Sequence, residues 1–338
     1  MKGLISDSNP RVTAVIPAYG KPDALATTLD HLASAQLDEV IVVDNSSSPE
    51  IRAVVEGRGE GVRLIDPGTN LGVAARNLAS REASGELLLS LDDDSYPLPG
   101  AVEAMVGAMS GNPATAVVGG LMRDRDSYGR RLSDDEVGSW DWWLRCGQGG
   151  EPPEEGFESN LFSEGAAMIR RDAFLEVGGW FEPFFHLSAE VDLTTRLIGS
   201  GWEIRYLPGA CFEHMREPKP PQYFQRSVYY RTRNQLWYYW LRFPTAVAIR
   251  RIPAYLLYFL GESLFRRQPG AWARAVRDAW WQRSRVADAR QPLPRSVIRK
   301  AERDRGRRLL RLMLTAMKRR LPGSDWRPDA EAGGRGPA

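Results

Sequence analysis

The chain has 338 residues, of which 43% are hydrophobic, and this composition is typical of a globular protein with one large domain or two smaller ones. Its two cysteines, Cys146 and Cys211, are too few for a disulfide framework and lack metal-ligand spacing, which favours a reducing compartment. The N-terminal segment MKGLISDSNP has no apolar run typical of a signal peptide, so we expect a cytoplasmic protein.

The net charge of +2 hides an uneven distribution. Residues 217–338 hold 27 Lys and Arg against 9 Asp and Glu, whereas residues 1–216 hold 18 against 34. An acidic half can bind a metal ion, and a basic half can bind phosphate or anionic lipid. We therefore expect a catalytic domain over 1–216, a basic aromatic helical region over 217–320 and a disordered tail over 321–338.

The first half of the chain alternates strand and helix patterns. In chain order these are a strand at 11–17, a helix at 22–35, strands at 39–44 and 61–66, a helix at 73–83 and a strand at 85–91. The alternation predicts an α/β fold with a Rossmann-like, mostly parallel central sheet flanked by helices. In such sheets ligands bind beyond the carboxyl ends of the strands.

Further elements follow with less regular spacing. The pattern predicts a helix at 101–110, a strand at 115–122, an irregular excursion over 123–160, a strand, short helix and glycine turn over 165–180, a helix at 189–201 and a strand region over 202–215. No internal repeat is present.

From about residue 222 the sequence becomes helical, aromatic and basic. Arg242, Arg250 and Arg251 interrupt every long apolar window, so a membrane-spanning helix is not expected. Basic helices with Trp and Tyr suit the surface of an anionic membrane, which favours peripheral contact with the inner face of the cell membrane. The same aromatic side chains would also serve as core if these helices pack on the catalytic domain, and both interpretations stay open. Another basic helix is predicted over 295–320.

Three strands end in chemically useful residues. The first ends at Pro17, Ala18 and Tyr19, the second at Asp44, and the fourth delivers the run Asp92–Asp94. Adjacent carboxylates repel one another, and burying them without a counter-ion is costly. The acidic run alone fits a metal site and a solvated turn about equally well, but the coincidence of three polar strand ends favours a binding cleft.

The ordered set of motifs resembles the family-two glycosyltransferases of the GT-A fold, including bacterial rhamnosyltransferase-like members. The matching segments lie within residues 11–216 and are VIPAYG, VIVVDNSS, NLGVAARN, LLLSLDDDSYP, GAAMIRRDAFLEVGGW and AEVDLTTRL. Each is weak alone, whereas their order is specific. The resemblance implies hexosyltransferase-type transfer of a sugar from a nucleotide diphosphate to an acceptor hydroxyl, with inversion at the anomeric carbon.

The resemblance also implies a metal ion at the acidic run. Asp92 and Asp94 match the Asp-x-Asp motif, and Mg²⁺ or Mn²⁺ there would neutralise the departing diphosphate. We expect Asp94 to be the direct ligand and Asp92 or Asp93 to face the ribose or a metal-bound water, with a turn-capping role as the alternative for Asp93. His214 follows the last strand and matches a histidine that some relatives use near the metal, although a structural role is the alternative.

Nucleotide-binding residues are implied in the same way. Asp44 would accept the N3–H of uracil or thymine, although it could instead cap the next helix. Other expected donor contacts are the Pro17, Ala18 and Tyr19 loop beneath the base, the turn at Asn70 and Gly72, and Arg76 on the base or phosphate. The alternative for Arg76 is a solvated helix charge.

The implied general base lies in the run Ala189–Asp192. Glu190 takes the base position and Asp192 a supporting one, although residues at i and i+2 do not share a helix face and Asp192 could pair structurally with Arg196. Ala189 replaces a more usual acidic residue. Gly178, Gly179 and Trp180 match the turn beside the transferred sugar, where Trp180 would stack on an acceptor ring or else lie in the core.

The expected partners are a UDP- or dTDP-sugar and a lipid-linked or cell-envelope glycan of polysaccharide biosynthesis, and we expect no nucleic acid. Two other classes remain open. A phosphatase of the haloacid-dehalogenase type also places Asp-x-Asp after an apolar strand, although normally near the first strand. A membrane-associated scaffold that binds nucleotide without catalysis would account for Ala189.

Overall fold

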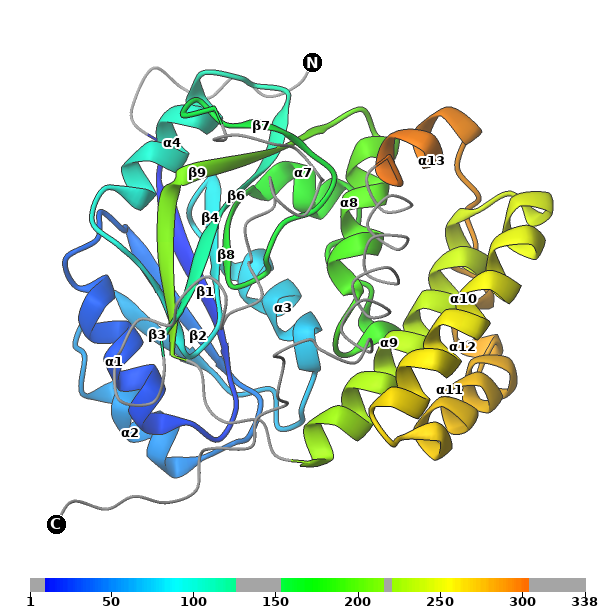
Figure 1. The fold of residues 1–338 in the computed structure, drawn as a ribbon. Helices are drawn as coiled ribbons and strands as arrows, with labels where there is room; N and C mark the ends of the chain where they lie inside the picture. Colours follow the sequence, from blue (N-terminus) through cyan, green and yellow to red (C-terminus); the bar gives the residue numbers. More distant parts are fainter. Residues whose placement is uncertain (1–9, 126–152, 216–220, 304–338) are drawn as a thin grey trace, which may run out of the picture.

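The computed structural model describes residues 10–125, 153–215 and 221–303. A twisted sheet stands between two layers of helices, and a bundle of further helices packs beyond one of these layers (Figure 1). The described part of the excursion at 123–160 is limited to its two ends, and the expected tail at 321–338 lies outside the described residues.

The sheet is parallel on one side and mixed on the other. Its strands are β1 (Val12–Ala18), β2 (Glu39–Asp44), β3 (Val62–Ile65), β4 (Leu87–Leu91), β5 (Ser95–Pro97), β6 (Thr115–Arg125), β7 (Phe157–Ser159), β8 (Ala166–Arg170) and β9 (Glu203–Met215). They run in the order β3-β2-β1-β4-β8-β6-β9-β5, with β7 also paired to β9. The strands β3, β2, β1 and β4 are parallel, whereas β8 is antiparallel to both β4 and β6. The carboxyl end of β4 therefore meets the amino end of β8.

Helices cover both faces of this sheet. In chain order they are α1 (Pro22–Leu32), α2 (Pro49–Glu56), η1 (Gly72–Ala74), α3 (Ala75–Glu82), α4 (Ala101–Ser110), α7 (Arg171–Glu176), η2 (Glu182–Phe184), α8 (Ala189–Gly199), α9 (Pro221–Arg242), α10 (Thr245–Phe265), α11 (Pro269–Trp281), α12 (Ser284–Ala287) and α13 (Arg295–Ala301).

Two hydrophobic clusters account for this layering. Side chains alternate across β1, so Val15 joins one cluster while Ala14 and Ile16 join the other. The second cluster is completed by α1, α2 and α4, and the first by α3, α7 and α8. Strands buried on both faces explain the continuous apolar runs in the sequence.

The C-terminal helices extend the first cluster and form one core with the sheet. Trp237, Tyr238, Tyr239 and Phe243 are all buried in it. Of the two interpretations of the aromatic segment at 222–243, packing on the catalytic domain is therefore the one the structure supports. Within the described ranges, no helix combines the length and the apolar character needed to cross a bilayer.

The strands and helices expected for residues 11–122 and 165–215 are present, with ends that differ by a few residues. The sequence patterns missed α2, α11, α12 and the short strands β5 and β7. Of the helix expected over 295–320, the described part is α13, which ends at Ala301.

Candidate active site

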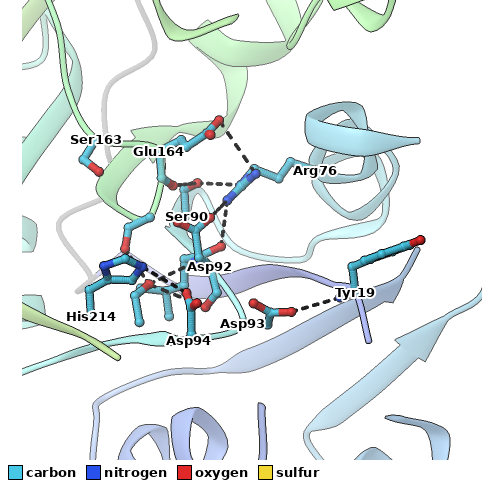
Figure 2. A network of polar contacts seen from close by, with 12 residues as sticks. Tyr19, Arg76, Ser90, Asp92, Asp93, Asp94, Ser163, Glu164 and His214 are labelled. Atoms are coloured by element: carbon cyan, nitrogen blue, oxygen red, sulfur yellow. Dashed lines mark hydrogen bonds and ion pairs between the residues drawn. The ribbon is translucent and has the colours of Figure 1, made fainter. Parts of the chain in front are cut away.

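The acidic run Asp92–Asp94 forms a tight turn that joins β4 to β5 (Figure 2). The backbone N–H of Asp92 donates to Ser95 Oγ at 2.9 Å, and the same hydroxyl donates to the carbonyl of Gly165 at 2.8 Å. Ser95 is fully buried. The turn is therefore anchored to the segment that leads into β8, and its carboxylates are held at a fixed place.

Asp94 is balanced by two basic side chains. Its Oδ2 lies 2.8 Å from Lys21 Nζ, and its Oδ1 lies 3.4 Å from His214 Nε2. Burial alone would raise the pKa of Asp94, but its contacts with His214 and Lys21 lower it to about 2. The carboxylate is therefore ionised at neutral pH. His214 lies beside the acidic run, as expected, whereas no sequence pattern singled out Lys21.

Asp93 faces the loop after β1. Its Oδ2 accepts the backbone N–H of Tyr19 at 2.9 Å, and its carbonyl accepts from Thr28 Oγ1 at 3.0 Å. Burial and the neighbouring charge of Asp94 raise the pKa of Asp93 to about 7. These contacts give Asp93 a role in positioning the Tyr19 loop, which is close to the turn-capping alternative.

Asp92 pairs with Arg76, a buried arginine on α3. Arg76 Nη2 lies 2.5 Å from Asp92 Oδ1 and donates to the Leu91 carbonyl at 2.9 Å, and Nε donates to Ser90 Oγ at 3.0 Å. Arg76 is only 3% exposed, so it is not a solvated helix charge. In the structure it holds Asp92, and its expected contact with the nucleotide stays a prediction.

Glu164 is a member of the site that the sequence reading missed. Its Oε2 lies 3.9 Å from Arg76 Nη1. Burial raises the pKa of Glu164 to about 8, the charges of Asp92 and Glu190 add to the rise, and Arg76 opposes it. The Glu164 carboxyl group is therefore within electrostatic range of Asp92 and of Glu190. The antiparallel start of β8 beside the end of β4 could have pointed to Glu164, but the pattern predicted a mostly parallel sheet.

Gly165 permits this close approach. A Cβ atom at Gly165 would lie 2.3 Å from Asp92 Oδ2, so a larger residue would displace the carboxylate. The glycine is therefore required by side-chain packing.

The first turn of α8 carries both residues that were expected to act in proton transfer. Asp192 is fully buried, with Arg242 Nε 2.6 Å from its Oδ1 and Arg196 Nε 2.8 Å from its Oδ2. This burial excludes direct contact of Asp192 with an acceptor, and its pair with Arg196 is the structural alternative named for it, so its supporting role in proton transfer stays a prediction. Glu190 is half-buried, and its charge helps to raise the pKa of Glu164.

A divalent cation fits this set of side chains by their chemistry. Mg²⁺ and Mn²⁺ are commonly bound through one or two carboxylates, with phosphate oxygens and water completing the shell. The described residues contain no group of three His, Cys, Asp or Glu side chains arranged to hold a metal alone. Asp92 and Asp94 can supply the two carboxylates, with His214 beside them, and the Lys21 ammonium already occupies a cationic position 2.8 Å from Asp94.

Asp44 holds the turn that leads to α2, whose N-cap is Ser48, and does not cap that helix itself. Its Oδ1 accepts from the backbone N–H and the hydroxyl of Ser46, at 2.9 and 2.6 Å, and its Oδ2 accepts from the Ser48 N–H at 2.7 Å. Asp44 is 1% exposed. A carboxylate offers about four lone-pair positions, so one stays available for a base, and that contact remains a prediction.

The loop after β1 lies next to the acidic run. Pro17 and Ala18 end the strand, and Tyr19 is 56% exposed. A nucleotide base could stack on the exposed Tyr19 ring while the Asp93 carboxyl group holds the Tyr19 backbone.

At the turn of Asn70 and Gly72, the backbone of Phe185 approaches the glycine closely, whereas the expected close contact was with the nucleotide. Asn70 Oδ1 accepts the Gly72 N–H at 2.8 Å, and Gly72 has a φ of +59°. A Cβ atom on Gly72 would lie 2.0 Å from the Phe185 carbonyl oxygen. The glycine therefore admits the segment before α8, and contact of this turn with the nucleotide stays a prediction.

The turn at Gly178–Trp180 joins the core. Trp180 is 1% exposed and packs near Phe162 and Phe174, and its backbone N–H and carbonyl bond to the Asn77 side chain. This burial excludes stacking of Trp180 on an acceptor ring and corrects that expectation in favour of the core alternative. Gly178 and Gly179 both have positive φ values, so their turn is a backbone requirement.

Comparisons with known proteins agree with this arrangement. The model of Glycosyl transferase family 2 matches residues 13–178. The chain belongs to this family. It is 27% identical over 209 residues to the N-acetylglucosaminyl-diphospho-decaprenol L-rhamnosyltransferase of Mycobacterium tuberculosis, covering 54% of this chain and 68% of that protein. It is 26% identical over 225 residues to the pre-mycofactocin glycosyltransferase of the same species, covering 65% of this chain and 46% of that one.

Solved structures confirm the GT-A fold of this family-2 glycosyltransferase. The mannosyltransferase PcManGT from Pyrobaculum calidifontis, in complex with GDP-Man and Mn²⁺, superposes with a TM-score of 0.52 at 17% identity, covering 92% of this chain and 87% of that one. GalNAc-T7 with UDP, GalNAc and Mn²⁺ gives 0.50 at 14% identity, covering 78% and 59%.

Proposed function

We propose that the protein transfers a sugar, with inversion, from a UDP- or dTDP-sugar to a hydroxyl group of a lipid-linked or cell-envelope acceptor. The observation that carries the proposal is that Arg76 lies 2.5 Å from Asp92 and 3.9 Å from Glu164, while Glu190 in the first turn of α8 is near enough to affect the pKa of Glu164. One end of this cluster suits a diphosphate and the other suits an incoming alcohol.

The donor end is formed by Asp92 and Asp94. A bound Mg²⁺ or Mn²⁺ would supply positive charge to the diphosphate as it leaves. Arg76 keeps the Asp92 carboxylate in place, and Lys21 brings a second cation next to Asp94. These fixed charges act where negative charge develops, which is how preorganised sites lower a barrier.

The acceptor end is formed by Glu190. Glu190 would take the proton of the acceptor hydroxyl. The oxygen of that hydroxyl would bond to the anomeric carbon as the bond from this carbon to the diphosphate oxygen breaks. Glu164 keeps its proton near neutral pH, so it adds no second negative charge beside Glu190. Asp192 fixes the start of α8 through its bonds to Arg196 and Arg242, and thereby orients Glu190.

Acceptor identity is supported by the relatives alone. The mycobacterial relative that matches over 54% of this chain is named for a diphospho-decaprenol acceptor. A lipid-linked acceptor would be reached at a membrane surface, most simply the inner face of the cell membrane.

The decisive experiment is a transfer assay on Glu190→Gln. Removing a general base typically costs about 10²- to 10⁴-fold in rate, while donor binding should be retained. The matched control is Glu182→Gln, an exposed glutamate just before α8, which should leave the rate unchanged. Thermal-shift measurements with UDP, dTDP and GDP, each with and without Mn²⁺, identify which nucleobase of the donor the protein prefers. Equal turnover of Glu190→Gln and the unchanged protein would overturn the proposal, and nucleotide binding without any turnover would favour the scaffold alternative.

A further inference from the structure

Helix α10 has an inner face packed in the core and an outer face that is almost wholly apolar. Tyr255 and Phe259 are buried, whereas Leu257 is 70% exposed. The large apolar side chains exposed along the helix are Ile249, Leu257, Leu264 and Phe265. The only acidic residue in the sequence of α10 is Glu262, which is tied to Arg231 and Arg266. Several large apolar side chains exposed on one helix in this way indicate an interaction site.

Two further exposed aromatic side chains lie on α11, which packs against α10. Trp280 and Trp281 end α11, and they are 66% and 73% exposed. The guanidinium of Arg283 lies 4.4 Å from the centre of the Trp280 ring. Exposed Trp beside Arg is typical of the zone between lipid headgroups and acyl chains, because the indole is apolar and still carries an N–H donor.

A basic pocket adjoins the first turns of α10. Its volume is about 660 Å³, and it lies between α10 and α13. It is lined by Ala246, Val247, Arg250, Arg251, Arg295, Ile298, Arg299 and Glu302. Among the residues that the structure describes, none of its four arginines forms a hydrogen bond or ion pair with another side chain. The carboxyl group of Glu302 accepts from Tyr238 Oη at 3.3 Å.

We propose that the outer face of α10, the two tryptophans of α11 and the arginine pocket together form a bilayer-docking face for an anionic phospholipid membrane. The apolar side chains would enter the headgroup boundary, and the pocket would take headgroup phosphates. Arginine forms paired hydrogen bonds with phosphate oxygens, and these arginines are available for such bonds because no protein acceptor among the described residues holds them. We choose a bilayer as the occupant because the arginine pocket adjoins the apolar face of α10. A lipid offers a phosphate group and an apolar chain at one surface.

The docking itself does not rest on the proposed function, although it would bring a lipid-linked acceptor close to the enzyme. Helix α9 connects the two parts, because Asn234 Nδ2 donates to the carbonyls of Phe184 and His186 in the segment that leads into α8. The bilayer-docking face and the helix that carries Glu190 are therefore held by one continuous core.

The test is co-sedimentation of the full chain with vesicles of phosphatidylglycerol and phosphatidylcholine, compared with vesicles of phosphatidylcholine alone. We expect binding to the anionic vesicles that weakens in high salt. Arg250→Gln combined with Arg299→Gln should lower the partition coefficient about 25-fold, because each arginine near an anionic surface contributes about fivefold. Leu257→Ser should lower it by about tenfold through lost burial of apolar surface.

The charge-matched control is Arg52→Gln combined with Arg81→Gln, two exposed arginines on α2 and α3, which should bind vesicles as well as the unchanged protein does. Circular dichroism checks that every variant is folded, and thermal shift with UDP or dTDP reads the donor site separately. Equal binding to both kinds of vesicle, or an equal loss in the control, would overturn the proposal while leaving the donor site intact. So would a dimer that Leu257→Ser dissociates, because a second copy would then be the occupant.

Discussion

The acidic edge of the sheet and the arginine pocket are both dense in charge, but they differ in how that charge is balanced. Asp92 and Asp94 each have a basic partner within the protein, namely Arg76 for the first and Lys21 with His214 for the second. The arginines of the pocket have no such partner among the described residues. Internally balanced charges are held in position for chemistry, whereas unbalanced charges indicate a partner outside the chain.

The largest expected effect is at Asp94. Asp94→Asn removes the charge that we propose faces the cation, so the transfer rate should fall on the order of 10³-fold, and stabilisation by nucleotide should lose its dependence on Mn²⁺. Steady-state transfer and thermal shift measure the two effects. Asp23→Asn, an exposed carboxylate in the first turn of α1, is the matched control. Ion-dependent stabilisation that persists in Asp94→Asn would place the cation elsewhere.

The next effect is on stability and concerns the junction of the two parts. Asp192→Asn leaves Arg196 and Arg242 without their carboxylate, and breaking a buried ion pair in this way costs about 3–5 kcal/mol. Urea unfolding measures the loss. Glu56→Gln on α2 removes an exposed pair with Arg52 and should cost less than about 1 kcal/mol.

The stability loss caused by Asp192→Asn should depend on pH. Burial favours the protonated form of Asp192, but Arg196 and Arg242 outweigh it and hold its pKa below the usual value. A carboxyl group with a lowered pKa contributes stability at pH values above its pKa in the unfolded chain, which is about 4. This contribution is lost as the pH falls through the pKa of the folded protein. The stability deficit of Asp192→Asn should therefore shrink in acid. A deficit that is constant from neutral to acidic pH would contradict this assignment.

A smaller effect is expected at Glu164. Because its pKa is raised to about 8, the carboxyl group is mostly protonated at pH 7, and the uncharged Glu164→Gln should change activity little there. The unfolded carboxyl group ionises near pH 4, so the unchanged protein loses stability as the pH rises from about 4 to 8, whereas the variant does not, and above pH 8 the difference stays constant. Unfolding curves at pH 5 and at pH 8 compare the two proteins. A large loss of activity at pH 7 would show that the Glu164 charge matters.

The smallest effect tests the two faces of α10. Leu257→Ser changes an exposed side chain and should alter the unfolding free energy by no more than about 0.5 kcal/mol. Phe259→Ala, two residues further on, empties a core position and should cost about 3–5 kcal/mol. Similar losses from both substitutions would mean that the outer face is covered in the folded protein.

Much of the donor half could be predicted from the sequence, because apolar runs and turn residues fix β1, β2, β4 and α8 locally. The acidic turn and its neighbour His214 were found in this way. Glu164 and Lys21 could not be found, because each meets its partner only through tertiary pairing, Glu164 through the antiparallel start of β8 and Lys21 across 73 positions of sequence.

Burial explains the other differences. Trp180 and a surface tryptophan look the same in a sequence, and the packing of Phe162 and Phe174 around its ring appears only once β8, α7 and the loop between them are assembled. The aromatic residues of α9 are core for the same reason, since α8 and α11 close over them.

The contact of Lys21 with Asp94 has a consequence for the order of events at the start of a reaction. A free divalent ion should bind Asp94 weakly, because it must displace the Lys21 ammonium group, which already lies 2.8 Å from the carboxylate. Once freed, that ammonium group is itself attracted to phosphate. In the proposed function, the ion and the sugar nucleotide would consequently arrive as a complex, with the lysine exchanging one anionic partner for the other.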